Sequence, residues 1–280
     1  MNNVLLNDIK MSLQNLGVEN NDNVMIYSSL KSFGYVEGGA KTVIDAIIEA
    51  VNCGTVIFPS FRQKDFVHAY ENWDIKTTQS DVGIISETIR KMPEVLRSDQ
   101  EAHSVCAFGK NAEYFTTRHK DGIKRIGVYG DTPFSYSSPY QKMYELNAKV
   151  LLLGVDFESN TFGHYVEYRY VNDLLESIND ESLKEEAISN VLTFNDTVKY
   201  RINNLPIEGS LIWPWFDRIK MQKHMRAKGL ISTTVCGKCE ITCFNVKDFV
   251  DLSFKELERN PFEWTNKGAV LWHRKYEKKI

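Results

Sequence analysis

Apolar residues recur along the first 175 residues of the chain with two spacings, one typical of buried strands and one of amphipathic helices. Strand-like runs lie at 24–30, 55–61 and 103–109, and a fourth ends at Gly154. Helix-like runs lie at 3–17, 41–51, 82–92 and 111–119, and Gly17 and Pro93 end two of them. Because strands and helices alternate, we predict an α/β layered fold here, with the irregular stretch 120–140 lining a surface cleft.

The rest of the chain has a different pattern. Segment 172–190 is acidic and weakly periodic, which favours a solvated helix face. The runs VLTFNDTVKYRI and ISTTVCGKCEITCF are β-rich, and KDFVDLSFKELERN returns to helical spacing. We therefore predict a central mixed β-sheet flanked by helices, with a β-rich C-terminal part, in a single unit of residues 1–280.

The segment LLLGVDFESNTFGHYVEYR, residues 151–169, carries candidate chemistry. Its apolar run ends at Gly154, where backbone can approach another group closely, and a polar loop then leads into residues that favour helix starts. His164 and Glu167 lie three apart, so on a helix they share a face. This pair is either a surface contact or the acid–base pair of an active site.

The composition of the chain narrows its class. Hydrophobic residues are 42% and charged residues 25%, and the net charge of −3 argues weakly against nucleic-acid binding. No apolar run approaches the roughly 20 residues of a membrane helix, and the first residues lack the pattern of a secretory signal. With five cysteines, an odd number, we expect reduced thiols in a cytoplasmic protein that binds neither nucleic acid nor membrane.

Three cysteines, Cys236, Cys239 and Cys243, lie close together, and CGKC is the half-site of many zinc ribbons. A structural zinc usually takes four ligands from two such pairs, and the sequence offers no second pair. The segment STTVCGKCEITCFNV instead predicts two strands around a Gly-Lys turn, without a metal.

Four collinear segments resemble the aminoglycoside 3-N-acetyltransferase family of antibiotic N-acetyltransferases. They lie at 27–51, 54–61, 82–109 and 138–169, and weaker similarity continues through GKCEITCFNVKDFVDLSFKEL. The resemblance implies a CoA-dependent N-acyltransferase that moves an acetyl or larger acyl group from acyl-CoA to an amino sugar, without a metal. It also implies that His164 is the base and Glu167 its acidic neighbour. We expect a CoA-binding part at about 1–175 and a part at about 176–280 that completes the acceptor cleft, and a homodimer stays open.

The turn YSSLKS presents hydroxyls, backbone N–H groups and a lysine, which suit phosphate or pantetheine amides. With the resemblance, four residues of this turn become cofactor contacts: Ser28, Ser29, Leu30 and Lys31. In RSDQEAHS, the resemblance adds four more, of which the last two fall near the cofactor thiol: Arg97, Ser98, His103 and Ser104. A nucleophilic Cys106 is disfavoured, because His103 would point to the opposite face of a strand.

The acceptor is less well defined. Gln100-Glu101 stand where the family usually has His-Pro, which changes the loop beside the acceptor pocket. An aminoglycoside and a nucleotide-linked amino sugar therefore both stay open. The residues expected to contact the acceptor are Asp99, His68 and Trp73. The aromatic group WPWF, 213–216, either closes the acceptor cleft or fills a core.

Acyl transfer from a thioester requires a neutral amine, two reactants held together and stabilisation of the charge on the thioester oxygen. His164 can take the amine proton, while Glu167 orients the imidazole or attracts the substrate. Two alternatives remain: a non-catalytic CoA- or carbohydrate-binding protein with the same fold, and a zinc-stabilised module built on CGKC.

Overall fold

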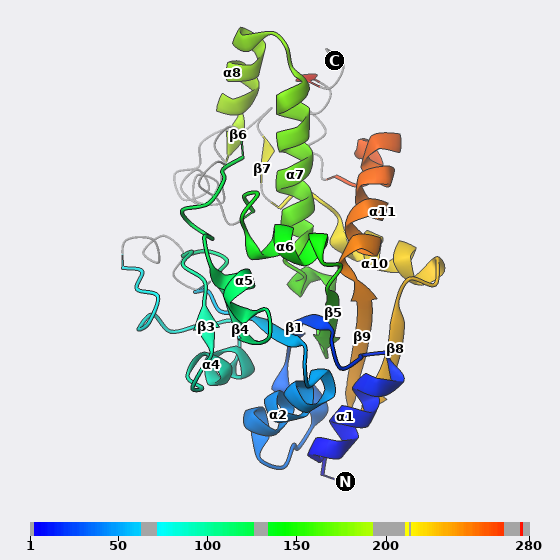
Figure 1. Cartoon of the computed structure of the whole chain (residues 1–280). Helices are drawn as coiled ribbons and strands as arrows, with labels where there is room; N and C mark the ends of the chain where they lie inside the picture. The colour runs from blue at the N-terminus through cyan, green and yellow to red at the C-terminus, as the bar shows by residue number, and fades with distance from the viewer. Residues whose placement is uncertain are drawn as a thin grey trace, which may run out of the picture.

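The computed structural model describes residues 3–62, 72–125, 134–192, 211–212, 214–265 and 275–276. Within these ranges seven strands form one sheet in the order β3-β4-β2-β1-β5-β9-β8 (Figure 1). The strands are β1 (Asn23–Ser28), β2 (Thr55–Pro59), β3 (Leu96–Arg97), β4 (Val105–Gly109), β5 (Lys149–Leu153), β8 (Ser232–Cys236) and β9 (Cys239–Asn245). A separate short parallel pair joins β6 (Val191–Leu192) to β7 (Leu211–Ile212).

The centre of the sheet is parallel and its edges are antiparallel. Strand β1 pairs in parallel with β2 on one side and with β5 on the other. Strand β4 runs antiparallel to β2, and β9 runs antiparallel to β5. The sheet is therefore mixed, as the sequence predicts, and strands β8 and β9 of the C-terminal part extend it.

Helices cover both faces of the sheet. Leu151 and Leu153 of β5 face one buried cluster, and Val150 and Leu152 face the other, because side chains alternate along a strand. The first cluster includes residues of α1 (Leu6–Asn15), α2 (Gly39–Val51) and α4 (Ile84–Arg90). The second includes residues of α5 (Ala112–Thr116), α6 (Pro139–Glu145), α7 (Phe162–Ser177), α8 (Glu181–Ser189), α10 (Arg218–Ala227) and α11 (Val246–Arg259).

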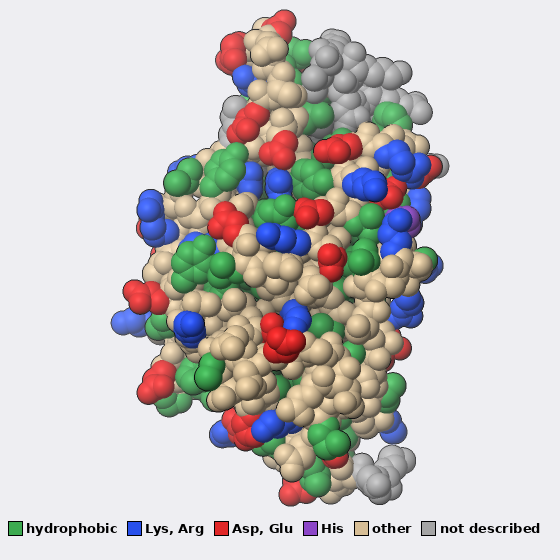
Figure 2. All heavy atoms as spheres, turned by 45° about the vertical axis from the view of Figure 1, so that its right-hand side comes forward, with side chains coloured by type: hydrophobic (Ala, Val, Ile, Leu, Met, Phe, Trp, Pro, Cys, Tyr) green, Lys and Arg blue, Asp and Glu red, His purple; other side chains and the backbone are tan. Residues whose placement is uncertain are grey.

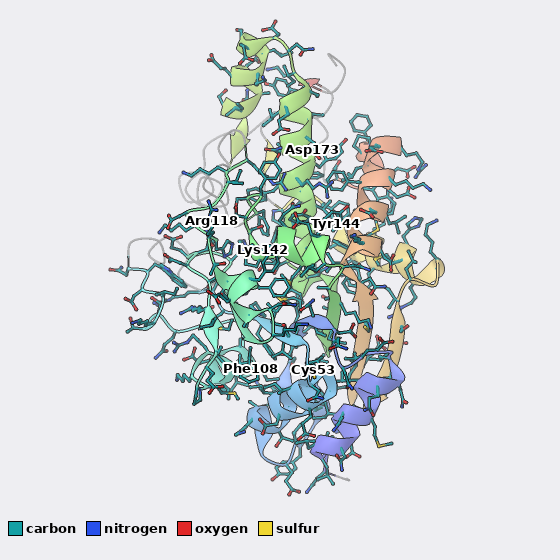
Figure 3. The ribbon with its side chains drawn as sticks, viewed as in Figure 1. Cys53, Phe108, Arg118, Lys142, Tyr144 and Asp173 are labelled. Atoms are coloured by element: carbon teal, nitrogen blue, oxygen red, sulfur yellow. The ribbon has the colours of Figure 1, made fainter. Side chains whose placement is uncertain are left out.

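Helix α6 ties neighbouring helices together through polar side chains (Figure 3). The ammonium of Lys142 donates to the carbonyl oxygens of Tyr114 and Thr117 at the end of α5, both at 2.7 Å. On the other side, the Tyr144 hydroxyl donates to Asp251 of α11 at 2.7 Å. The first contact satisfies a buried ammonium, and the second joins α6 to α11 near the surface.

The carboxyl ends of β1 and β5 meet at one edge of the sheet, since the strands are parallel and Ser28 pairs with Leu153. The short 3-10 helix η1 (Leu30–Phe33) follows β1, and η3 (Phe157–Ser159) follows β5. Gly154 has φ 67°, and a Cβ there would lie 2.1 Å from the Cβ of Ser32. The close approach predicted at Gly154 is thus the contact between these two connections.

Most predicted elements are present with shorter bounds. The strand expected at 103–109 begins only at Val105, and the strand expected at 24–30 ends at Ser28. The predicted hairpin around Gly237-Lys238 is confirmed as β8 and β9. Part of the irregular stretch, 126–133, and most of the run after Leu192 lie outside the described residues.

The outer surface carries charge of both signs. On the face shown in Figure 2, acidic and basic side chains are scattered among one another. Such mixing is typical of a globular surface. No helix in the described ranges combines the length and the apolar character that a membrane span needs.

Candidate active site

The first turn of α7 carries the candidate base. Thr161 N–H donates to the Tyr27 hydroxyl at 3.2 Å, and Phe162 N–H donates to Asn160 Oδ1 at 3.2 Å. The next two N–H groups, of Gly163 and His164, donate to backbone carbonyls at 3.0 and 2.9 Å. The turn is therefore fixed by strand β1 and by its own capping residues, and it places His164 beyond the carboxyl ends of β1 and β5.

His164 and Glu167 form the hydrogen-bonded pair that their spacing predicts. Nδ1 of His164 lies 2.7 Å from Oε2 of Glu167, whose side chain is 0% exposed. The other carboxylate oxygen, Oε1, accepts from the backbone N–H groups of Trp215 and Phe216, at 2.6 and 2.7 Å. Burial of a carboxylate is costly unless it is well hydrogen-bonded, and these three donors meet that requirement.

The arrangement selects one tautomer of the imidazole. An ionised carboxylate can only accept hydrogen bonds, so Nδ1 of His164 carries the proton in the contact with Glu167. In the neutral ring Nε2 is then the nitrogen with the lone pair, and it is the atom that can accept a proton. About a fifth of the His164 side chain, 22%, is exposed.

His103 lies beside this pair. Its ring centroid is 5.6 Å from that of His164 and 5.0 Å from those of Phe61 and Phe134. Burial, followed by the electrostatic influence of the neighbouring His164, His119 and Arg218, holds the pKa of His103 well below its ordinary value. His103 is therefore neutral across the physiological pH range.

The loop that carries His103 is held by Gln100. The side-chain oxygen Oε1 of Gln100 accepts from the N–H groups of Ala102 and His103, at 2.7 and 2.6 Å. Gln100 is 2% exposed, so this amide closes the turn in a buried place. Glu101 forms an ion pair with Lys120. Gln100 and Glu101 thus belong to a well-bonded turn.

Arg97, expected at the cofactor, lies together with Trp73 and Asp99, which were expected at the acceptor. The guanidinium of Arg97 donates to Thr78 O at 2.6 Å and to Ser60 O, and lies 4.4 Å from the Trp73 ring centroid. Trp73 Nε1 donates to Asp99 Oδ1 at 2.8 Å. Burial lowers the pKa of Arg97 to about 10. In this structure these side chains hold segment 72–80 against β3.

Ser98 and Ser104 are both 0% exposed. The Ser98 hydroxyl accepts from Val105 N–H at 2.9 Å and contacts His119 Nδ1 at 2.8 Å. The Ser104 hydroxyl donates to Ser60 O at 2.9 Å. Each hydroxyl would have to leave these partners to contact a cofactor, so cofactor contacts at these two residues stay predictions.

Ser28 and Ser29 are half-buried at the end of β1, as is Leu30, while Lys31 is exposed. The N–H of Ser29 donates to Leu153 O at 2.9 Å, which fixes this turn beside the end of β5. The hydroxyls of Ser28 and Ser29 have no hydrogen-bond partner among the described residues.

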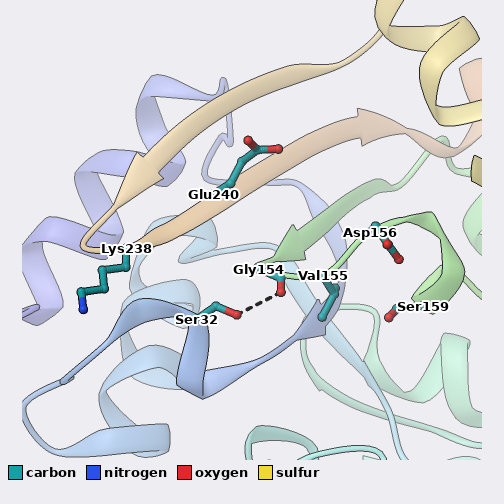
Figure 4. A pocket seen from close by; sticks show the side chains of 7 residues that line it. All are labelled: Ser32, Gly154, Val155, Asp156, Ser159, Lys238 and Glu240. Atoms are coloured by element: carbon teal, nitrogen blue, oxygen red, sulfur yellow. Dashed lines mark hydrogen bonds between the residues drawn. The ribbon is translucent and has the colours of Figure 1, made fainter.

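A cavity of about 590 Å³ adjoins this turn (Figure 4). Its lining residues come from the turns after β1 and β5 and from the β8–β9 hairpin: Ser32, Gly154, Val155, Asp156, Ser159, Lys238 and Glu240. His164 is not among them and follows Ser159 by five residues. The sequence pointed to Ser32 of the YSSLKS turn and to Gly154 and Ser159 of the segment after β5. It did not point to Lys238 and Glu240 as lining residues, because the hairpin is far away in the chain.

Arg218 is another residue that the sequence did not single out. It is the first residue of α10 and is 7% exposed. Its Nη2 donates to Glu158 Oε2 at 2.9 Å, and its side chain lies against Gly163. No spacing rule connects residues 55 apart, so only the fold shows this contact.

The remaining candidate residues lie outside the described ranges or away from His164. His68 and Trp213 lie outside the described residues. Cys239 is buried opposite Cys236 in the hairpin, and burial raises its pKa to about 12. Within the described ranges no group of three or more His, Cys, Asp or Glu could hold a metal. Cys106 faces the cluster of α2 and α4, away from the rings around His103.

Comparison with known proteins gives a consistent result. The sequence model of a family described as aminoglycoside 3-N-acetyltransferase matches residues 25–258. A prophage-derived aminoglycoside N(3')-acetyltransferase-like protein, YokD of Bacillus subtilis, is 34% identical in an alignment 182 residues long that covers 58% of this chain and 64% of that protein. An aminoglycoside N(3)-acetyltransferase III of a Salmonella species is 33% identical in an alignment 176 residues long that covers 57% of this chain and 58% of the relative. The match thus spans less than two thirds of either relative.

Two solved structures share the fold. AAC-IIIb, in a binary complex with CoASH, superposes with a TM-score of 0.68 at 18% identity, over 92% of this chain and 97% of that one. A variant of AAC(3)-IVa in complex with apramycin gives a TM-score of 0.64 at 20% identity, over 93% of this chain and 95% of that one.

Proposed function

Because the chain belongs to the aminoglycoside 3-N-acetyltransferase family, we propose that it transfers an acetyl or related acyl group from acyl-CoA to the amine of an amino sugar. The observation that carries this proposal is the His164–Glu167 pair with its two backbone donors. A carboxylate locked in this way holds the imidazole in one orientation and one tautomer, which is what a general base requires.

The proposed reaction needs no covalent enzyme intermediate. The acceptor nitrogen bonds to the carbonyl carbon of the thioester as its proton passes to Nε2 of His164. The C–S bond then breaks, and the departing thiolate takes a proton from the imidazolium, which leaves an amide and CoA. A positioned base typically supplies about 10²–10⁴ in rate, or roughly 3–5 kcal/mol.

We assign the turn at residues 28–31 and the neighbouring cavity to acyl-CoA. The hydroxyls of this turn have no partners among the described residues, and Lys31 is exposed beside them. In the cavity, Asp156 already accepts from Glu158 N–H and Glu240 pairs with Arg226. The ammonium of Lys238 forms no ion pair within the described part of the chain, so it can meet a phosphate.

The acceptor is an aminoglycoside or an amino sugar linked to a nucleotide. Support for the first comes from the family and from AAC(3)-IVa with apramycin. What favours the second is that Gln100-Glu101 stand where the resemblance leads us to expect His-Pro.

The decisive experiment incubates the protein with acetyl-CoA and a panel of aminoglycosides and nucleotide-linked amino sugars, and follows thiol release. We expect release with at least one acceptor, and a loss of about 10²–10⁴ in kcat for His164→Ala. CoA binding without release from any acceptor would favour a non-catalytic binding protein. Full activity of His164→Ala would remove the imidazole from the mechanism.

A further inference from the structure

A buried cation lies against the helix turn that carries His164. Arg218 is 7% exposed, and a Cβ on Gly163 would lie 2.1 Å from its Cδ and 2.6 Å from its Cγ. Only glycine at position 163 therefore leaves room for this side chain. Because Gly163 directly precedes His164, the guanidinium stem packs beside the proposed base.

The surroundings of Arg218 compensate its charge poorly. Its partner Glu158 has a side chain that is 60% exposed, so water weakens the attraction. Arg218 also lies at the N-terminal end of α7, where the helix dipole disfavours a cation. The buried Nε of Arg218 has no acceptor among the described residues. A buried donor without a partner is costly for folding alone, which points to an anionic ligand.

Asn160 presents a second such donor at the same helix turn. It is 0% exposed, and its Oδ1 accepts from Phe162 N–H at 3.2 Å. Its Nδ2 is buried and has no acceptor among the residues that the structure describes. The backbone N–H groups from Thr161 to His164 are all hydrogen-bonded, so at this turn only side chains remain to meet an oxygen.

We propose that Arg218 and Asn160 are the donors that hold the thioester carbonyl oxygen during acyl transfer. The inference rests on the proposed function. When the acceptor nitrogen bonds to the carbonyl carbon, the π electrons of C=O move to oxygen, and the resulting oxyanion meets the guanidinium and the amide. When C=O reforms, the C–S bond breaks and its electrons leave with sulfur. Donors shielded from water are effective here, because they need no reorganisation as the charge develops.

The test compares kcat and KM of six variants with those of the wild type, using the acceptor found in the panel. Asn160→Asp keeps an oxygen that can cap Phe162 and replaces the amide donor by a second carboxylate oxygen, which also brings a negative charge. Arg218→Met keeps the length of the stem and removes the charge. Glu158→Gln is the matched control, because it removes the negative charge of the exposed partner of Arg218 and keeps a side-chain oxygen that can accept from Nη2. Gly163→Ala, alone and combined with Arg218→Ala, displaces the guanidinium by a different route.

We expect Asn160→Asp and Arg218→Met to lower kcat by about 10²–10³ with KM for acetyl-CoA and acceptor within about threefold. Glu158→Gln should stay within about threefold of the wild type. Gly163→Ala should lower kcat as much as Arg218→Met does. The double variant Gly163→Ala/Arg218→Ala should have a kcat no lower than that of Arg218→Ala alone. Unfolding temperatures close to that of the wild type show that each variant is folded.

The proposal is overturned if Arg218→Met has the kcat of the wild type. If this variant changes only the KM for the acceptor, by raising it, Arg218 is a contact of the acceptor and not of the thioester oxygen. Asn160→Asp with normal kcat would exclude the amide. These outcomes require an active wild-type protein and leave the proposed function intact. A wild type that binds CoA and transfers no acyl group would overturn both.

Discussion

Glu167 joins His164 to a segment 48 and 49 residues further along the chain. One carboxylate oxygen meets the imidazole at 2.7 Å, and the other accepts the N–H groups of Trp215 and Phe216. The ring of the proposed base is therefore oriented by a group that is itself held on its far side. Such second contacts normally fix both the angle and the tautomer of an active-site histidine.

Glu167→Gln tests the tautomer. The glutamine oxygen can still accept from Trp215 and Phe216 N–H, which turns its NH₂ toward Nδ1 of His164. A donor facing Nδ1 forces the ring proton onto Nε2, where it blocks proton acceptance. We expect kcat to fall by at least about 10² while the protein stays folded. The measurement is thiol release beside circular dichroism, and unchanged kcat would show that the tautomer does not matter.

His103 should make stability depend on pH. Its pKa is lowered in the folded protein, first by burial and then by His164, His119 and Arg218, whereas in the unfolded chain it is near 6.5. Below about pH 6.5 the unfolded chain therefore binds a proton that the folded protein does not, and stability is lost as the pH falls. One such proton contributes at most about 1.4 kcal/mol per pH unit.

Urea unfolding of the wild type and of His103→Phe at pH 7.5 and 5.5 measures this contribution. Other groups titrate in both proteins, so they cancel in the difference. We expect the wild type to lose more free energy of unfolding between the two pH values than the variant loses. Equal losses would mean that His103 titrates alike in both states.

Gly154→Ala should destabilise the fold more than Gly17→Ala. Both glycines have positive φ, 67° and 80°, so each substitution strains the backbone by about 1–2 kcal/mol. A Cβ at Gly17 meets nothing within 4 Å, whereas one at Gly154 lies 2.1 Å from the Cβ of Ser32. We expect a further loss of about 1–3 kcal/mol at Gly154 from this overlap. Equal losses in urea unfolding would contradict the close approach of the two connections.

Gln100→Ala should loosen the loop that carries His103. Two buried N–H groups, of Ala102 and His103, would lose their acceptor, which costs about 1–3 kcal/mol. Gln100→Glu keeps an oxygen in place and is the matched control. Denaturant unfolding gives the loss of free energy, and hydrogen exchange at these two amides locates it. If the amides of Ala102 and His103 stay protected from hydrogen exchange in Gln100→Ala, the turn does not depend on the Gln100 side chain.

The sequence predicted those relationships that are local or periodic. His164 and Glu167 share a helix face because they lie three apart, and Gly154 marks a close approach because strand and glycine occur together. The layered order of strands and helices followed from alternation along the chain. Each of these depends on backbone geometry that spacing reports directly.

Contacts between distant segments could not be read in this way. Nothing in the spacing links Glu167 to Trp215 or Arg218 to Gly163, because tertiary packing alone brings them together. The predicted strand at 103–109 was too long at its start, because Gln100 bends the chain at His103 and pairing with β2 begins only at Val105. A buried side-chain acceptor leaves no periodic signal.

The double anchorage of Glu167 has a consequence for how the chain can be divided. A fragment that stops before Trp215 would keep the imidazole and its carboxylate yet leave Oε1 without the two amides that steady it. Separately expressed halves should therefore show no turnover until they are mixed. Reconstitution would have to return those two amides to Oε1 before the imidazole of His164 regains its orientation.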